Sequence, residues 1–161
     1  GSEFWVDLPV LEAPALPNVH APKRADSTSR LEDGTARLVL YVEDNPANVT
    51  FMRDLLSSFE SIELLATPTA EEGLVQARAR RPSVILMDIN LPGMSGLDAL
   101  RALRSWPETR DIPVIALTAA ASPRDRQRGE EAGFHRYLAK PIKVDEFEAV
   151  LEVLLAPVSS A

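Results

Sequence analysis

Residues 84–96, VILMDINLPGMSG, place an apolar run directly before a single aspartate and a loop rich in turn-forming residues. The apolar run is typical of a buried strand. Because an unpaired charge is costly to bury, Asp88 is expected either to lie exposed at the tip of that strand or to be paired with a cation. The choice depends on what stands at the ends of the neighbouring strands.

Segments with strand and helix patterns alternate on both sides of this stretch. Strands are predicted at RLVLYVEDN (37–45), IELLAT (62–67), SVILMD (83–88), IPVIALT (112–118) and HRYLA (135–139). Helical spacing of apolar residues and helix-start signals predict helices at 46–59, at 70–81, after Ser95, after Ser122 and at 144–155. Such regular alternation of strands and helices predicts a parallel sheet with helices on both faces.

Residues that favour helix starts precede several of these segments. Asn45 stands before Pro46, a combination typical of an N-cap followed by the first helical residue. Thr69 and Glu72 have the spacing of a capping box. By contrast, Lys143 stands where Asp or Ser is usual, so the last helix is expected to have a weaker start.

The composition of the chain excludes several classes of function. A formal net charge of −7 over 161 residues argues against a nucleic-acid surface, which needs a basic patch. The absence of cysteine excludes disulfides, thiolate metal sites and thiol nucleophiles. No apolar run approaches membrane-spanning length, and no signal-peptide pattern opens the chain. We therefore expect a soluble, cytoplasmic domain without membrane contact.

The N-terminal part differs in texture from the rest of the chain. Residues 11–36 are rich in Pro, Ala, Ser and charge without an apolar period, which is typical of a linker. Before them, residues 1–10, GSEFWVDLPV, alternate like a short strand. The folded domain is expected to cover residues 37–157.

Polar side chains stand at the carboxyl ends of the predicted strands: Glu43 and Asp44 at the first, Asp88 at the third, Thr118 at the fourth, and Lys140 after the fifth. Because function in parallel α/β sheets collects at these ends, the groups are expected to converge at one rim. Three acids without a cation would raise one another's pKa. Carboxylate oxygens favour Mg²⁺ as that cation, and the lysine adds a second positive charge.

A carboxylate, Mg²⁺, a lysine and a hydroxyl are the parts needed to accept a phosphoryl group on an aspartate. The metal and the lysine neutralise the phosphoryl oxygens as they arrive, so catalysis consists mostly of positioning and charge stabilisation. Aspartate is a known covalent nucleophile for phosphate. These residues therefore predict that Asp88 stands at a strand tip in order to be phosphorylated.

Four motifs occur in order at characteristic intervals: VEDN (42–45), MDINLPGMSG (87–96), ALTA (116–119) and YLAKP (137–141). Through them the chain from about Leu38 to Ala156 resembles the receiver domain of two-component response regulators, the family that includes the chemotaxis regulator. The resemblance implies a flavodoxin-like (βα)5 fold, a doubly wound parallel five-stranded sheet with strand order 2-1-3-4-5. It also implies that the domain catalyses its own aspartyl phosphorylation and dephosphorylation.

The resemblance assigns roles to the acids at the rim. Asp88 would be the phosphoacceptor and a metal ligand. Asp44 would bind Mg²⁺ directly, and Glu43 would assist through water. Asn90 would offer its backbone carbonyl to the metal. The lifetime of the phosphoryl group, which residues such as Asn90 and Ala120 influence in this family, stays open.

The resemblance also assigns a switch. Lys140 would pair with the phosphoryl group, and its bond to Pro141 is expected to be cis. Thr118 would donate its hydroxyl to a phosphoryl oxygen while Tyr137 rotates inward, which repositions the face formed by helix four, strand five and helix five. Helix four, within SPRDRQRGEEAG (122–133), has almost no apolar stripe, so little packing should hold it in place.

The implied partners are proteins of phosphotransfer. The phosphodonor would be the phosphohistidine-bearing dimerisation domain of a histidine kinase or a histidine phosphotransfer protein, and a homodimer stays open. Residues 1–9, GSEFWVDLP, resemble the final strand of histidine-kinase ATP-binding domains. This second resemblance favours the interpretation that the chain is the C-terminal receiver of a hybrid sensor histidine kinase. The alternative for residues 1–4 is a tag remnant left by an expression vector.

Two other functions deserve comparison. A phosphatase of the haloacid-dehalogenase type also uses a strand-end Asp with Mg²⁺, but it needs a second Asp two residues later, where this chain has Asn90. A degenerate receiver would act as a phosphorylation-independent binding module. Such domains usually lack the acceptor, an acidic residue or the lysine, whereas this chain keeps all of them, so phosphotransfer is favoured.

Overall fold

The computed structural model describes residues 36–119 and 122–156. The predicted strand within residues 1–10 lies outside these ranges, as does all but the last residue of the predicted linker, 11–36. Ala120 lies outside them too.

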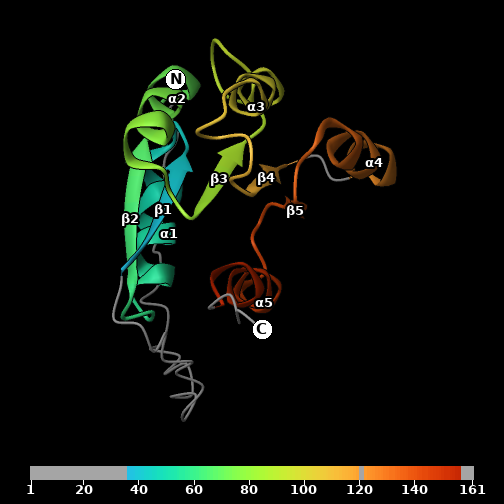
Figure 1. Cartoon of the computed structure of the whole chain (residues 1–161). Coiled ribbons are helices and arrows are strands. Elements are labelled where there is room, and N and C mark those ends of the chain that lie inside the picture. The colour runs from blue at the N-terminus through green and yellow to red at the C-terminus, as the bar shows by residue number, and fades with distance from the viewer. Residues whose placement is uncertain (1–35, 120–121, 157–161) are drawn as a thin grey trace, which may run out of the picture.

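Five parallel strands form one sheet in the order β2-β1-β3-β4-β5, as expected. The strands are β1 (Arg37–Val42), β2 (Ile62–Thr67), β3 (Val84–Asp88), β4 (Val114–Thr118) and β5 (Arg136–Ala139). The strand order reverses between β1 and β3, because β2 lies on the outer side of β1 and the later strands follow on the other side (Figure 1). In such sheets this reversal places a crevice at the carboxyl ends of the two central strands.

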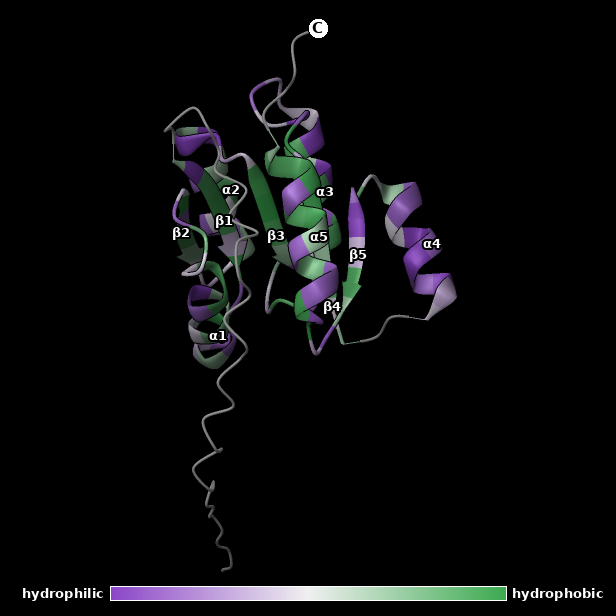
Figure 2. Cartoon of the chain, turned by 90° about the horizontal axis from the view of Figure 1, so that it is seen from below, coloured by the Kyte–Doolittle hydropathy of each residue, from purple (hydrophilic) through white to green (hydrophobic). Residues whose placement is uncertain are grey.

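Helices cover both faces of the sheet. They are α1 (Pro46–Leu56), α2 (Ala70–Arg80), α3 (Gly96–Ser105), α4 (Pro123–Ala132) and α5 (Val144–Leu155). In Figure 1, α2 and α3 lie on one side of the sheet and α5 on the other, and Figure 2 shows α5 in front of the strands. Helix α1 shares the side of α5, because its buried residues Met52 and Leu56 pack into the same core. The fold is therefore the doubly wound flavodoxin-like arrangement that the alternation and the resemblance predicted.

The helix starts follow the predicted signals. The Asn45 side chain caps α1 by accepting a hydrogen bond from the Ala47 amide at 2.9 Å. The Thr69 hydroxyl accepts from the Glu72 amide at 3.1 Å, which is the hydroxyl half of the predicted capping box. Lys143 precedes α5 without a capping side-chain bond, which confirms its weaker start.

The end of α1 comes earlier than predicted, because two serines terminate it. The predicted helix ran to Phe59, but α1 ends at Leu56. The hydroxyls of Ser57 and Ser58 donate to the carbonyls of Asp54 and Leu55. Serines that bond to nearby backbone groups compete with helix hydrogen bonds, which explains the shorter helix.

Alternating residues of the strands build two cores, one on each side of the sheet. On the α1/α5 side, Tyr41, Leu86, Leu117 and Leu138 pack with α1 and α5 residues such as Met52 and Phe147. On the α2/α3 side, Val42, Met87 and Ala116 pack with Leu74, Leu100 and Leu103. Since neighbouring side chains of a strand point to opposite faces, β3 and β4, which are buried along their whole length, contribute to both cores at once.

Helix α4 is held in a different way from the other four. Most of its residues are hydrophilic by their colour in Figure 2, and Gly129 is its one buried residue. A Cβ atom built on Gly129 would lie 2.7 Å from Cε2 of Tyr137 and closer still to Cδ2. The absence of a side chain at Gly129 therefore lets the Tyr137 ring lie against the helix backbone, with Phe134 edge-on to the ring at 6.4 Å between centroids.

We expect Gly129→Ala to destabilise the protein by about 1 kcal/mol, because the clash with Tyr137 outweighs the better helix propensity of alanine. Urea unfolding measures the change in the free energy of unfolding. In a Tyr137→Ala background the ring is gone, and the same substitution should become stabilising, by up to about 1 kcal/mol. Stabilisation by Gly129→Ala in the presence of Tyr137 would contradict this account of α4.

Candidate functional site

The candidate site lies at the carboxyl ends of β1, β3 and β5. Glu43 follows β1, Asp88 ends β3, and Lys140 follows β5. Continuing the alternation of each strand places these three side chains on the face that α1 and α5 cover. The sheet pleat therefore gathers charges that are far apart in the sequence into one space.

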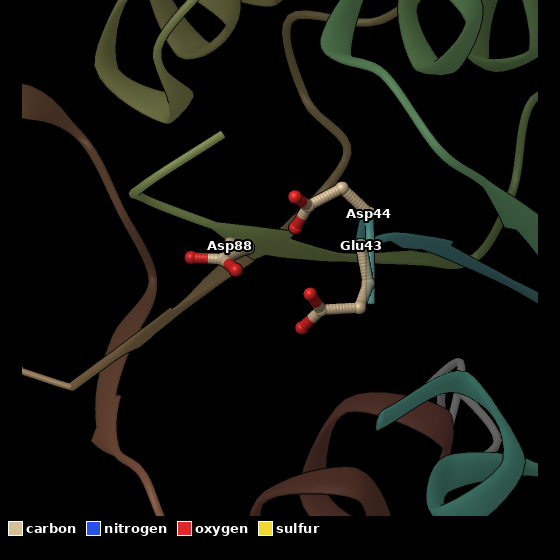
Figure 3. A group of neighbouring side chains, drawn as sticks. All are labelled: Glu43, Asp44 and Asp88. Atoms are coloured by element: carbon tan, nitrogen blue, oxygen red, sulfur yellow. The ribbon is translucent and has the colours of Figure 1, made fainter. Parts of the chain in front are cut away.

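Three carboxylates meet at this rim. Figure 3 shows Glu43, Asp44 and Asp88 side by side, and one oxygen of each lies within 4.8 Å of the others. Glu43 and Asp88 are buried, whereas Asp44 is exposed. No hydrogen bond or ion pair joins the Asp44 carboxylate to another residue that the structure describes. Its oxygens are thus accessible from solvent, next to two carboxylates that are already held in place.

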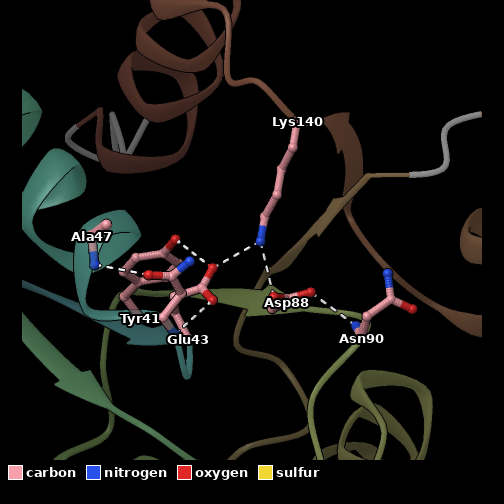
Figure 4. A network of polar contacts seen from close by, with 7 residues as sticks. Tyr41, Glu43, Ala47, Asp88, Asn90 and Lys140 are labelled. Carbon is pink, nitrogen blue, oxygen red and sulfur yellow. Dashed lines mark hydrogen bonds and ion pairs between the residues drawn. The ribbon is translucent and has the colours of Figure 1, made fainter. Parts of the chain in front are cut away.

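The Glu43 side chain is only 1% exposed, and its carboxylate accepts hydrogen bonds from three donors. Its Oε1 accepts from the Asn45 amide at 3.1 Å. Its Oε2 accepts from the Tyr41 hydroxyl at 3.0 Å and from the Lys140 ammonium at 2.8 Å (Figure 4). A buried carboxylate needs such partners, because each unmet hydrogen bond adds to the cost of burial.

The Asp88 carboxylate is fixed from two sides. Oδ1 accepts from the Asn90 amide at 2.8 Å, and Oδ2 accepts from Lys140 Nζ at 2.9 Å (Figure 4). Asp88 is only 5% exposed. The strand-end aspartate is therefore both buried and paired with a cation, which is the second of the two arrangements that its sequence context allowed.

Lys140 bridges the two buried acids with one ammonium group, and its side chain is 21% exposed. Burial opposes the charge, but hydrogen bonds to Glu43 and Asp88 outweigh that effect and raise the pKa of Lys140. Burial likewise raises the pKa of the Glu43 carboxyl, but hydrogen bonds from Lys140 and the Asn45 amide outweigh it and lower the pKa overall. Both groups are therefore charged near neutral pH. The Lys140–Pro141 bond is cis, as expected.

The remaining two predicted residues lie on the other face of the sheet. Thr118 ends β4, is 2% exposed and is in register with Ala139 of β5. Tyr137 of β5 packs against the core on the α2/α3 side. The pleat thus separates the site into two parts, with the ion pairs on the α1/α5 side and the residues of the predicted switch on the side of α4.

These observations are complemented by a family model. A model of the response regulator receiver domain matches residues 39–152, which is most of the chain. The chain belongs to the response regulator receiver family. A receiver is a domain of two-component signalling, and receivers interact with histidine kinases or phosphotransfer proteins.

Relatives of known sequence and structure agree with this membership. The receiver is 43% identical to the polar-differentiation response regulator DivK of Brucella anthropi over 109 residues, 68% of this chain and 88% of that protein. It also matches the receiver domain of sensor histidine kinase PA1611 from Pseudomonas aeruginosa with a TM-score of 0.69 and 34% identity, covering 76% of this chain and 100% of that one. That crystal structure has a magnesium ion coordinated in its active-site cleft.

The chemotaxis protein CheY4 of Vibrio cholerae gives a third comparison. It matches this receiver with a TM-score of 0.68 and 26% identity, covering 74% of this chain and 99% of that chain.

Among the residues that the structure describes, no helix combines the length and the apolar character that a membrane crossing requires.

One member of this receiver's polar network was not predicted from the sequence. Tyr41 lies two residues before Glu43 on β1, where the apolar pattern of RLVLYV suggests only a core residue. Strand alternation is the signal that could have found it, because residues i and i+2 share a face. A tyrosine on the face of a buried acid offers that acid a hydroxyl donor.

Proposed function

We propose that this receiver accepts a phosphoryl group from a phosphohistidine onto Asp88, with Mg²⁺ held at the rim, and that phosphorylation switches the α4–β5–α5 face. The observation that carries the proposal is the fixed Asp88 carboxylate, bound by the Asn90 amide and the Lys140 ammonium beside two further carboxylates. In the transfer, a carboxylate oxygen forms the new P–O bond while the P–N bond of the donor breaks. The donor imidazole keeps the electron pair of that bond.

The residues at the rim suit a magnesium ion. Asp44, Asp88 and Glu43 present the hard oxygen ligands that Mg²⁺ prefers, and the backbone carbonyl of Asn90 would complete the protein ligands. When bound, the ion would supply charge neutralisation for the phosphoryl oxygens. Asp44 is suited to bind it first, because its carboxylate is exposed while those of Glu43 and Asp88 are paired with Lys140.

The other residues have roles that follow from their positions. Lys140 would release one of its carboxylate partners and pair with the incoming phosphoryl group. Thr118 would donate its hydroxyl to a phosphoryl oxygen from the end of the neighbouring strand. Tyr137 would follow on the same face, and α4 would respond because Gly129 lies directly against the Tyr137 ring.

We further propose that the chain is the receiver of a cytoplasmic hybrid sensor histidine kinase. Two observations support this context. Residues 1–9, GSEFWVDLP, resemble the last strand of kinase ATP-binding domains. The PA1611 receiver, to which this one is similar, comes from a sensor histidine kinase. The phosphodonor would then be the kinase's own dimerisation domain or a histidine phosphotransfer protein.

Intact-protein mass spectrometry after incubation with acetyl phosphate tests the phosphoacceptor role. We expect one phosphoryl group to be added to the wild type in the presence of Mg²⁺, and none to be added without Mg²⁺ or to Asp88→Asn. Asp111→Asn is the matched control, because it removes a carboxylate that is 91% exposed and far from the rim in the fold, after α3. If the wild type gains no phosphoryl group, the chain is better described as a phosphorylation-independent binding module.

A further inference from the structure

Tyr41 joins the apolar core to the charged rim. It is 1% exposed and packs on the α1/α5 side of the sheet, among the largest fully buried side chains. Its hydroxyl nevertheless reaches Oε2 of Glu43, 3.0 Å away. Burial in the first place, and then the neighbouring Glu43 carboxylate, raise the pKa of Tyr41. In this contact the hydroxyl is the donor and the carboxylate oxygen is the acceptor.

The oxygen that Tyr41 contacts is shared with Lys140. Both groups donate to Oε2 of Glu43, while Oε1 accepts from the Asn45 amide. Of the three donors, Lys140 is the one that would move, since the same ammonium also binds Asp88 and would turn to a phosphoryl group. The Tyr41 hydroxyl on Oε2 and the Asn45 amide on Oε1 would then be the two donors that still hold the Glu43 carboxylate.

The length of the Glu43 side chain matches this arrangement. An aspartate at the same position would draw the carboxylate back toward the strand by one carbon–carbon bond, about 1.5 Å. The Tyr41 ring is confined by the core around it and could not follow. The tyrosine hydroxyl and the longer acid thus form a matched pair on one face of β1.

We propose that Tyr41 is a positioning residue that holds the Glu43 carboxylate beside Asp44 and Asp88, in place for a divalent cation. This inference rests on the proposed function, because it concerns the Mg²⁺ site of that proposal. Tyr41 acts only through Glu43 and contacts no reacting atom. Partners of metal-site ligands typically fix the direction of the ligand and so affect metal affinity.

The test measures the dissociation constant of Mg²⁺ by calorimetry on the full chain. We expect Tyr41→Phe, which removes only the hydroxyl, to weaken Mg²⁺ binding by about 10-fold. Thr67→Val is the matched control. It removes another buried hydroxyl at a strand end, one that has no hydrogen-bond partner among the described residues, and it should leave the affinity unchanged.

A double-mutant cycle shows whether Tyr41 acts through the length of Glu43. In a Glu43→Asp background the hydroxyl has no carboxylate within reach, so adding Tyr41→Phe should change the Mg²⁺ affinity by less than about 2-fold. An equal loss in both backgrounds would overturn the inference. So would a Tyr41→Phe variant that binds Mg²⁺ as tightly as the wild type.

A metal-free measurement separates positioning from packing. Hydrogen exchange of the Asn45 amide reports the place of the Glu43 carboxylate, because that amide donates to Oε1. We expect the Asn45 amide proton to exchange several-fold faster in the Tyr41→Phe variant, and at the wild-type rate in the Thr67→Val variant. A lower melting temperature in Tyr41→Phe with unchanged exchange and Mg²⁺ affinity would mean that the hydroxyl serves stability alone, and would overturn the inference.

The same experiments distinguish this inference from the proposed function. If the wild type binds no Mg²⁺, or if the Asp44→Asn variant binds Mg²⁺ as tightly as the wild type, then the proposed metal site fails and the inference fails with it. If Asp44→Asn abolishes binding while Tyr41→Phe does not weaken it, the metal site stands and only the role of Tyr41 is overturned.

Discussion

A Lys140→Met variant is expected to accept a phosphoryl group from acetyl phosphate about 100-fold more slowly than the wild type. The ammonium group is the one side-chain cation within hydrogen-bond distance of both Glu43 and Asp88 in the described structure. Without it, the charge that develops on the phosphoryl oxygens would lose a donor already placed at the acceptor. Methionine keeps the unbranched apolar stem, so the loss should reflect charge and not packing.

The affinity of the Lys140→Met variant for Mg²⁺ should equal or exceed that of the wild type. Lys140 neutralises Glu43 and Asp88 in the metal-free protein, so it competes electrostatically with a second cation at the same carboxylates. The rate is measured by mass spectrometry over time at saturating Mg²⁺, and the affinity by calorimetry. Lys143→Met, which removes an exposed ammonium three residues later, is the control. A wild-type rate in Lys140→Met would contradict the proposed role of this lysine.

Gly96→Val is expected to lower the free energy of unfolding by about 3 kcal/mol. Gly96 is buried at the first turn of α3. A Cβ atom there would lie 2.7 Å from the backbone oxygen of Asp88 and 2.9 Å from the Cα of Ile89. Backbone atoms cannot rotate away as a flexible side chain can, so the helix would have to separate from the end of β3. That movement would also displace the segment that holds the Asp88 carboxylate.

Gly93→Ala provides the comparison for Gly96→Val in urea unfolding. Gly93 has a φ of +78°, but the nearest atom to an added Cβ is Oε1 of Glu71 at 3.5 Å. This substitution should therefore cost only the backbone strain of alanine in the left-handed region, about 1 kcal/mol. Equal losses at the two positions would show that the close approach of α3 to β3 has no special weight.

The elements of the fold were predictable because their signals are local. The apolar run before Asp88, the Asn45 and Pro46 pair at the start of α1, and the hydroxyl of Thr69 each act within a few residues. The convergence of the strand-end residues was predictable as well, since parallel strands joined by helices must end at the same rim. The errors are small and local too: α1 stops three residues before Phe59 because serine hydroxyls bind its last carbonyls.

The close contacts were not predictable because they depend on how closely each helix packs against the neighbouring strand. Gly96 and Gly129 look like helix residues of poor propensity in the sequence, yet each faces a neighbour that leaves no room for a methyl group. The pairing of Lys140 with two acids was foreseen only as a convergence of charges. Which of the acids it binds depends on the lateral order of the strands.

From the sequence alone follow the alternation of strands and helices, and the identity of the polar residues at the carboxyl rim. Those properties depend on side-chain periodicity and chain connectivity, which a single sequence contains. The tertiary structure alone decided that Asp88 is buried against Lys140, that Asp44 is exposed, and that the Tyr41 hydroxyl meets Glu43. Hydrogen bonds form or fail over a few tenths of an ångström, and only the packed sheet sets distances on that scale.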